Sequence, residues 1–206
     1  MTLNKIKKNS GFTIIEALIA IFILSVSVVS MLGMTSKSTS SARYANNEIT
    51  ANYLLQEAID SVRNSRDTIA FQKKEDASLG GWSKFLGRYG YPASKCFSAA
   101  GCYLETEKFN PEDINGGDIK TCTDIITSEN PTGCPMLSYD GELTSAIFYI
   151  YKDLDPSPSI FSRKVTFKEV NSDEIKVTAE VSWSNGNGTT PKTQKLEISL
   201  LNWIND

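Results

Sequence analysis

The sequence has no histidine among its 206 residues. Histidine is the commonest general base and the commonest metal ligand of proteins, so its absence excludes Ser-His-Asp and Cys-His catalysis. Lysine-based or paired-carboxylate chemistry stays open, but nothing in the pattern of residues points to it. We therefore expect no enzymatic activity, no cofactor and no metal centre.

Acidic residues outnumber basic ones, 24 to 21. The formal net charge is −3, and it falls to −6 without Lys5, Lys7 and Lys8. These lysines lie in residues 1–11, which contain no acid. Because phosphate contacts need a cationic face, the acidic remainder of the chain argues against nucleic acid as a partner.

Charge is almost absent between Phe12 and Met34, where Glu16 is the only charged residue. The run FTIIEALIAIFILSVSVVSMLGM would rise roughly 34 Å as a helix, which spans a bilayer core of about 30 Å. It is longer than the apolar part of a secretory signal peptide, and no A-x-A pattern closes it. We expect a membrane-spanning helix whose N-terminus stays in the cytoplasm, because the lysines precede it.

A plain membrane anchor does not explain Glu16. A charged side chain inside a membrane helix costs about 2.5–3.5 kcal/mol, so it calls for a named partner. Cleavage between Gly11 and Phe12 would create an α-amine at Phe12, one helical turn before Glu16. The carboxylate can then meet the amine of its own chain or that of a neighbouring subunit, and both pairings remain open.

Residues 7–16, KKNSGFTIIE, resemble the prepilin processing motif of the type IV pilin family. The resemblance implies that Gly11 ends a leader peptide removed by prepilin peptidase. It also implies that Phe12 becomes the N-methylated N-terminus, and that Glu16 neutralises the N-terminus of an adjacent subunit during assembly. One departure is the lack of any proline before Pro92, since many major pilins carry one in this segment. We therefore expect a straight first helix.

A second helical stretch follows the apolar run. The residues TSKSTSS at 35–41 are poor helix formers and predict a weak point. Apolar residues then recur at steps of three and four, which predicts an amphipathic continuation over 35–66 that ends near residues 64–67. The residues of this face are Ala51, Leu54, Leu55, Ala58, Ile59 and Val62.

The C-terminal part shows the period of two that is typical of strands. Residues 174–183 and 195–200 alternate between apolar and polar side chains, and Asn185 to Gly188 predict a hairpin loop between them. Val165 and Phe167 indicate a third strand and residues 143–151 a fourth, with a turn at residues 155–158. Four sequential strands favour an antiparallel meander on which the amphipathic helix packs.

The middle segment, residues 72–142, has little periodicity beyond a helix predicted around residues 82–89. Its four cysteines, which the expected topology places outside the cytoplasm, indicate disulfides. Close spacing favours Cys96 with Cys102 and Cys122 with Cys134, while crossed pairings stay open. Zinc is disfavoured by the spacing and by the lack of histidine. A calcium loop is a weaker alternative, with the oxygen-bearing residues Asn110, Glu112, Asp113, Asn115 and Asp118.

These predictions give an α+β chain similar to the type IV pilin fold: a long N-terminal helix packed on a C-terminal antiparallel sheet of about four strands. The leader is residues 1–11, the membrane or filament-core helix 12–34, and the head 67–206. The resemblance implies a minor pilin or pseudopilin, anchored in the inner membrane and assembled into a pilus or periplasmic pseudopilus. Its expected partners are prepilin peptidase, other pilin subunits and an inner-membrane assembly platform. The alternative is a tip pilin with an adhesin or DNA-uptake role, in which the loops of the middle segment bind the ligand. Aromatic residues that could serve such recognition are Trp82, Tyr89, Tyr91 and Tyr103.

Overall fold

The computed structural model describes residues 11–75, 81–105, 110–111, 113, 115–123, 130–140, 148–151, 158–184 and 190–203. The chain divides into two compact units, Met1–Asn46 and Asn47–Asp206. The second unit, called the head below, contains the sheet and the buried core. The leader residues 1–10, the predicted hairpin loop at 185–188 and most of the predicted turn at 155–158 lie outside the described residues.

Helix α1, Ile14–Glu75, continues through the predicted weak point at residues 35–41. Hydroxyl groups within the helix donate to carbonyls one turn earlier, which satisfies them inside the helix without ending it. Thr35 Oγ1 donates to Met31 O at 3.0 Å and Thr39 Oγ1 to Thr35 O at 3.0 Å. The hydroxyls of Ser25, Ser27 and Ser30, which come earlier in the helix, also donate to backbone carbonyls three or four residues before them.

The predicted end of the helix near residues 64–67 is wrong, because α1 reaches Glu75. The apolar face that begins at Ala51 continues to Ile69 and Ala70, and both are buried in the core. Burial of one more turn of this face outweighs the polar run Asn64 to Asp67, whose low propensity suggested an end.

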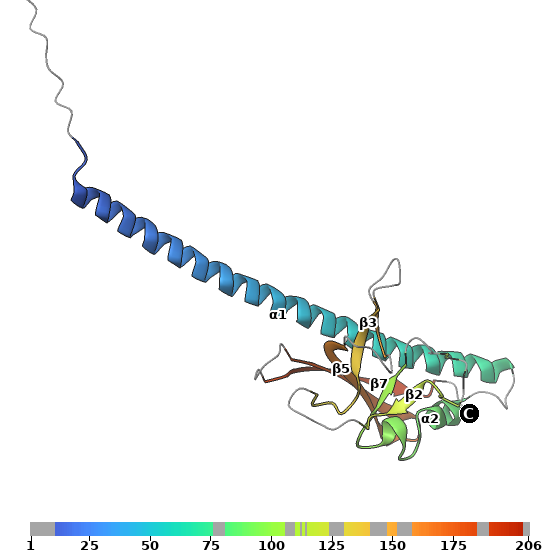
Figure 1. Ribbon diagram of the computed structural model, residues 1–206. Helices are drawn as coiled ribbons and strands as arrows, with labels where there is room; N and C mark the ends of the chain where they lie inside the picture. Colours follow the sequence, from blue (N-terminus) through green and yellow to red (C-terminus); the bar gives the residue numbers. More distant parts are fainter. Residues whose placement is uncertain are drawn as a thin grey trace, which may run out of the picture. The chain divides into compact units, whose positions relative to one another are not determined.

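Within the described residues, seven strands form one antiparallel sheet. They are β1 Cys102–Leu104, β2 Ile119–Thr121, β3 Met136–Asp140, β4 Phe148–Ile150, β5 Pro158–Asn171, β6 Glu174–Trp183 and β7 Lys192–Leu201. Strands β5, β6 and β7 form the predicted meander, with ten registered pairs between β6 and β7. Figure 1 shows these strands on one side of the residue 47–75 part of α1.

The sheet differs from the prediction in its other members. The predicted four-strand meander is wrong at β4, since β3 lies between β4 and β5 in the order β2-β1-β5-β3-β4. Strands β1, β2 and β3 come from the middle segment, and two of them have only three residues, too short to show a period. The helix predicted around 82–89 is confirmed as α2, Trp82–Arg88, and a 3-10 turn follows at Lys95–Phe97.

The core lies between the residue 51–70 face of α1 and one face of β5 and β6. Strand β6 alternates half-buried and buried residues until its buried end, and Val165, Ile175 and Val177 are fully buried. A buried cation joins the two layers: Arg163 Nη1 donates to Leu54 O at 3.2 Å and lies 3.0 Å from Glu57 Oε2. These two contacts offset part of the cost of burying the guanidinium.

Candidate processing and assembly site

Gly11, Phe12 and Thr13 precede the first turn of α1 and are exposed. A Cβ added at Gly11 would meet no atom within 4 Å, and the side chain of Phe12 is 79% exposed. The peptide bond between Gly11 and Phe12 therefore lies in exposed chain that precedes the helix, where a protease can reach it.

Glu16 lies in the first turn of α1. Its N–H donates to Thr13 O at 3.1 Å and lies 3.4 Å from Thr13 Oγ1, so Thr13 acts as the N-cap. Thr13 and Glu16 have the T-x-x-E spacing of a capping box, and an acid here also suits the helix dipole. A local role of Glu16 in capping thus competes with the assembly role expected for it.

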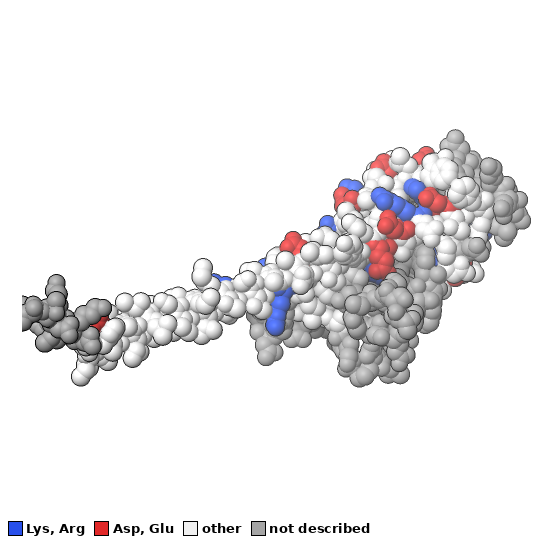
Figure 2. All heavy atoms as spheres, turned by 90° about the horizontal axis from the view of Figure 1, so that it is seen from above, with Lys and Arg blue, Asp and Glu red and all other residues white. Residues whose placement is uncertain are grey.

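The surface around Glu16 is apolar. Every residue from Gly11 to Met34 is exposed in the single chain, and Figure 2 shows this half of the helix almost entirely without charge. Its most apolar window has a mean hydropathy of 2.5, and by length and composition the helix can cross a membrane. An apolar surface of this length is stable only when lipid or other protein covers it.

The four cysteines of the middle segment form two disulfides, Cys96–Cys102 and Cys122–Cys134. These are the two pairings that close spacing favours. The bonds lie next to each other, because Cys102 pairs with Thr121 across β1 and β2 and Cys122 N–H donates to Gly101 O at 3.0 Å. Oxidised sulfurs offer no thiolate, so the zinc alternative loses its ligands.

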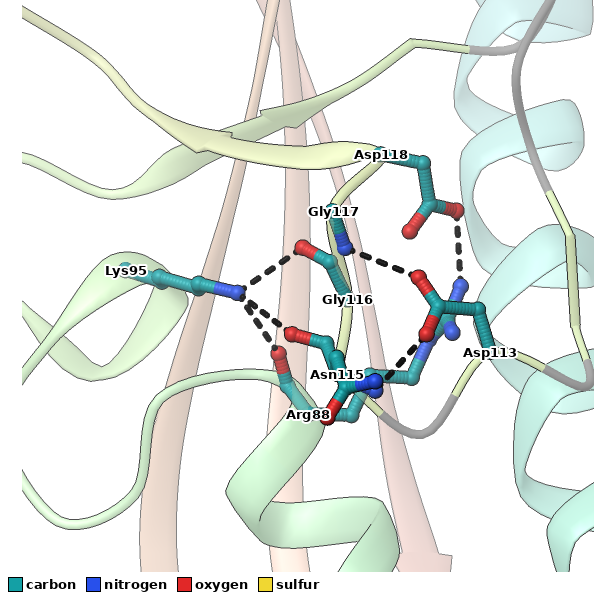
Figure 3. A network of polar contacts seen from close by, with 7 residues as sticks. All are labelled: Arg88, Lys95, Asp113, Asn115, Gly116, Gly117 and Asp118. Carbon is teal, nitrogen blue, oxygen red and sulfur yellow. Dashed lines mark hydrogen bonds and ion pairs between the residues drawn. The ribbon is translucent and has the colours of Figure 1, made fainter.

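Three of the residues considered for calcium, Asp113, Asn115 and Asp118, bind other groups of the protein (Figure 3). The Nζ of Lys95 donates to three backbone carbonyls: Gly116 O at 2.8 Å, Asn115 O at 3.2 Å and Arg88 O at 3.4 Å. The ammonium group thus fills the kind of oxygen cage that a metal ion would need. Lys95 has φ 45°, a left-handed conformation that lysine rarely adopts.

The acids beside this cage are also bonded. Asp113 accepts from Asn115 N–H at 2.9 Å and Gly117 N–H at 3.0 Å, and the Gly117 bond, followed by the Asn115 bond, lowers the pKa of Asp113. Asp118 Oδ2 lies 2.7 Å from Arg88 Nη2. Burial raises the pKa of Asp118, and the Arg88 guanidinium opposes that rise.

The cage is closed by a glycine. A Cβ at Gly116, whose φ is +62°, would lie 2.5 Å from Arg88 O, so only glycine fits there. Glu112 lies outside the described residues. Among those that are described, no three His, Cys, Asp or Glu side chains are grouped to hold a metal ion. Sequence reasoning found the acids of this network but missed Arg88 and Lys95, which carry no spacing signal.

Comparison with known proteins bears on the N-terminal site. Residues 6–32 match the family model of the prokaryotic N-terminal methylation motif. The match includes Gly11, Phe12, Glu16 and most of the apolar run, and it ends well before the head. No curated protein and no solved structure matches the chain.

Proposed function

We propose that this chain is a type IV pilin-like protein and a structural subunit of a filament, because residues 6–32 match the N-terminal methylation motif, which is the leader signature of type IV pilins and pseudopilins. The signature implies processing by prepilin peptidase and assembly with other pilins. In the proposed sequence of events, the peptidase cuts after Gly11 and Phe12 becomes the methylated N-terminus. The apolar half of α1 then leaves the lipid and packs against the helices of other subunits.

The observation that carries this proposal is an acid within an exposed apolar helix. A carboxylate in hydrocarbon is costly when it is alone and is stabilised by a nearby cation, because attraction between charges is strong at low dielectric. The α-amine of Phe12 in an adjacent subunit provides such a cation. Glu16 would then favour one axial position of each helix against its neighbour.

The capping role of Glu16 can be separated from the charge role. Glutamine serves as well as glutamate in a capping box but has no charge. We therefore expect Glu16→Gln and Glu16→Ala to block incorporation into sheared filaments equally, while both variants still enter the membrane. Equal incorporation of Glu16→Gln and the wild type would exclude the charge role.

Processing is tested independently with Gly11→Leu. We expect this variant to remain uncut, so mass spectrometry of the membrane-bound protein should find residues 1–11 still attached. Ser10→Ala, which changes the leader next to the same bond, provides the control and should be cut normally. Removal of the leader from Gly11→Leu would contradict the assigned cleavage site.

We further propose that the chain is a minor pilin or pseudopilin rather than a major pilin. The large middle segment, held by two disulfides, supports this assignment, since a subunit used in few copies needs no compact repeating head. The N-terminus would face the cytoplasm and the head the periplasm or the exterior, with an inner-membrane platform as assembly partner. Of the aromatic residues considered for a tip ligand, Trp82 and Tyr89 are buried in the core, so the structural role is preferred.

A further inference from the structure

Strand β7 has a long free edge. It pairs along its whole length with β6 and, within the described residues, with no other strand. The ten pairs between the two strands run without a register shift, and no proline or glycine interrupts β7. Every second residue of such a strand points its N–H and C=O groups away from the sheet, and a regular row of these groups is a template for another extended strand.

The core-facing side of β7 is incompletely covered. Leu196 and Ile198 pack against the core but are only half-buried, whereas their partners on β6, Ala179 and Val177, are fully buried. The sheet ends at β7, so no further strand flanks these two side chains. An added strand with apolar side chains on this face would remove more of their surface from water.

The opposite face of the sheet carries a row of alternating charge. Lys164, Glu180 and Lys195 lie directly opposite one another on β5, β6 and β7. The Nζ of Lys164 lies 3.9 Å and that of Lys195 lies 3.0 Å from Glu180 Oε2. The row ends at the edge with Lys195, whose side chain is 61% exposed. An acid opposite Lys195 on an added strand would continue the alternation, and opposite charges across two strands stabilise their pairing.

Two residues further along β7 the edge charge has the opposite sign. Glu197 lies 2.9 Å from Lys176 Nζ, and its side chain is 52% exposed. An added strand therefore meets a lysine and a glutamate that are separated by Leu196. Lysines at a sheet edge commonly oppose pairing. A lysine and a glutamate together discriminate between partners instead, because a strand with the complementary order of charges avoids like charges and a strand with the reverse order does not.

We infer that the free edge of β7 binds an extended segment of another protein by antiparallel strand addition. All strand pairs of the described sheet are antiparallel, which is also the slightly more stable arrangement. From its N- to its C-terminus, the segment presents a base to Glu197, an apolar residue to Leu196 and an acid to Lys195. Backbone hydrogen bonds provide the affinity, and the two charge pairs fix the register.

A strand of another protein fits this edge better than β7 of a second copy, although Lys195-Leu196-Glu197 itself has the required order. Within the head, β7 runs along α1, because Gln194 donates to Glu48 at 3.0 Å and Trp203 donates to Asp67 at 3.3 Å. Antiparallel pairing of two copies would place their Glu48 ends at opposite ends of the paired heads. That arrangement does not suit two chains anchored in one membrane, and this choice of occupant rests on the proposed function.

The test uses the full wild-type chain in mild detergent and a fluorescent peptide with the sequence of residues 190–201, which contains the required order of charges. We expect saturable binding, measured by fluorescence anisotropy. A peptide of the same composition in which Lys195 and Glu197 are exchanged should bind at least roughly tenfold more weakly, because like charges then face each other at two positions. Equal affinities of the two peptides, or no binding of the first, would overturn the inference.

Backbone methylation shows whether the peptide binds as a strand. One peptide is N-methylated at positions 194, 196 and 198, and another at positions 195, 197 and 199. Successive N–H groups of a strand point to opposite sides, so one of these peptides should lose binding while the other retains it. The same result for both peptides, whether binding or loss, would refute strand addition.

Exchanging the charges in the protein locates the site. The chain with Lys195→Glu and Glu197→Lys should prefer the exchanged peptide, while Lys84→Glu, at an exposed lysine of α2, should keep the wild-type preference. An unchanged preference in the doubly substituted chain would place the binding site elsewhere. Equal urea midpoints of this chain and the wild type would show that the exchange acts on binding and not on folding, and the peptide comparisons with the wild-type chain decide the inference in either case.

The two proposals can fail separately. If Glu16→Gln and Gly11→Leu both assemble normally, the proposed function falls, while peptide binding to β7 still stands or falls on its own measurements. If the peptides fail to bind but Glu16→Gln blocks incorporation, the filament role stands and the inference about the edge falls. A dimer of the full chain that the peptide dissociates would assign the edge to a second copy and overturn the choice of another protein.

Discussion

Among single residues, two buried tyrosines make the stability of the head depend on pH. Tyr89 and Tyr151 are buried, and Tyr151 Oη donates to Arg163 O at 2.9 Å. Burial raises the pKa of each phenol to about 12, mainly because the phenolate would lose its hydration. Neutral tyrosine is therefore the form that the folded head requires.

The sign of the pH dependence follows from these values. A tyrosine in the unfolded chain ionises near pH 10, so between pH 10 and 12 the unfolded state binds fewer protons than the folded state. Stability is thus unaffected below pH 10 and falls as pH rises to 12, by about 1.4 kcal/mol per tyrosine at pH 11. Urea unfolding at pH 9 and pH 11 measures this fall. Tyr89→Phe and Tyr151→Phe should each lose less stability between the two pH values, and a fall equal to that of the wild type would contradict the prediction.

Lys95 is the second residue whose role can be measured. Lys95→Met keeps most of the side-chain volume but removes the ammonium group from three carbonyls. Hydrogen bonds to a charged group contribute about 1.5–3 kcal/mol when buried, and Lys95 is half-buried, so we expect a loss of about 1–2 kcal/mol in the free energy of unfolding. Lys168→Met, at an exposed lysine of β5, is the matched control and should change stability by less than about 0.5 kcal/mol. Equal effects would assign Lys95 no special role.

Among the secondary structure elements, the last turns of α1 give a direct test of packing. Ile69 is fully buried, whereas Phe71, two residues later, is 59% exposed. Ile69→Ala should cost about 2–5 kcal/mol, because it removes buried methyl groups and leaves a cavity. Phe71→Ala should cost less than about 1 kcal/mol in the purified protein. Chemical denaturation of both variants in detergent compares them, and equal costs would mean that the helix does not pack on the core beyond residue 67.

The same elements show what the sequence can and cannot predict. A regular spacing of apolar residues over a long segment predicts which face of that segment is buried. The spacing from Ala51 to Val62 identified the buried face of α1, and the alternation over residues 174–183 identified β6. Short strands such as Cys102–Leu104 and Ile119–Thr121 have no measurable period, and they exist because partners distant in sequence pair with them. The position of β3 between β4 and β5 depends on the same non-local pairing, so the simple meander was the wrong extrapolation.

The candidate site likewise has a part that could be predicted from the sequence and a part that could not. Gly11, Phe12 and Glu16 are adjacent in sequence, and their spacing was enough to identify the motif matched over residues 6–32. Lys95 and Arg88 belong to another kind of site, in which contacts between residues 20 or 30 positions apart, as for Lys95–Asn115 and Arg88–Asp118, decide the chemistry. A single lysine or arginine gives no sign of such a contact in a sequence, so only the three-dimensional structure shows that an internal ammonium group occupies the cage.

At the scale of the whole molecule, one continuous helix serves two different environments. The described residues before Asn47 are all exposed in the single chain. The buried core begins at Ala51. Figure 2 shows charged side chains gathered on the head and not on the apolar half of the helix. Solubility in a membrane and folding of the head therefore depend on separate sets of residues.

This separation makes a prediction for a chain that begins at Thr35. No buried core residue is removed, so its urea midpoint in plain buffer should equal that of the full chain in mild detergent, with a free energy of unfolding within about 0.5 kcal/mol. The shortened chain should also be soluble without detergent, because the exposed apolar run from Phe12 to Met34 is gone. A chain shortened to begin at Leu55 is the control: it loses Ala51 and Leu54 from the core, together with the carbonyl that accepts from Arg163, and should unfold at much lower urea. If both chains lost stability alike, residues 1–34 would be part of the folding unit of the head.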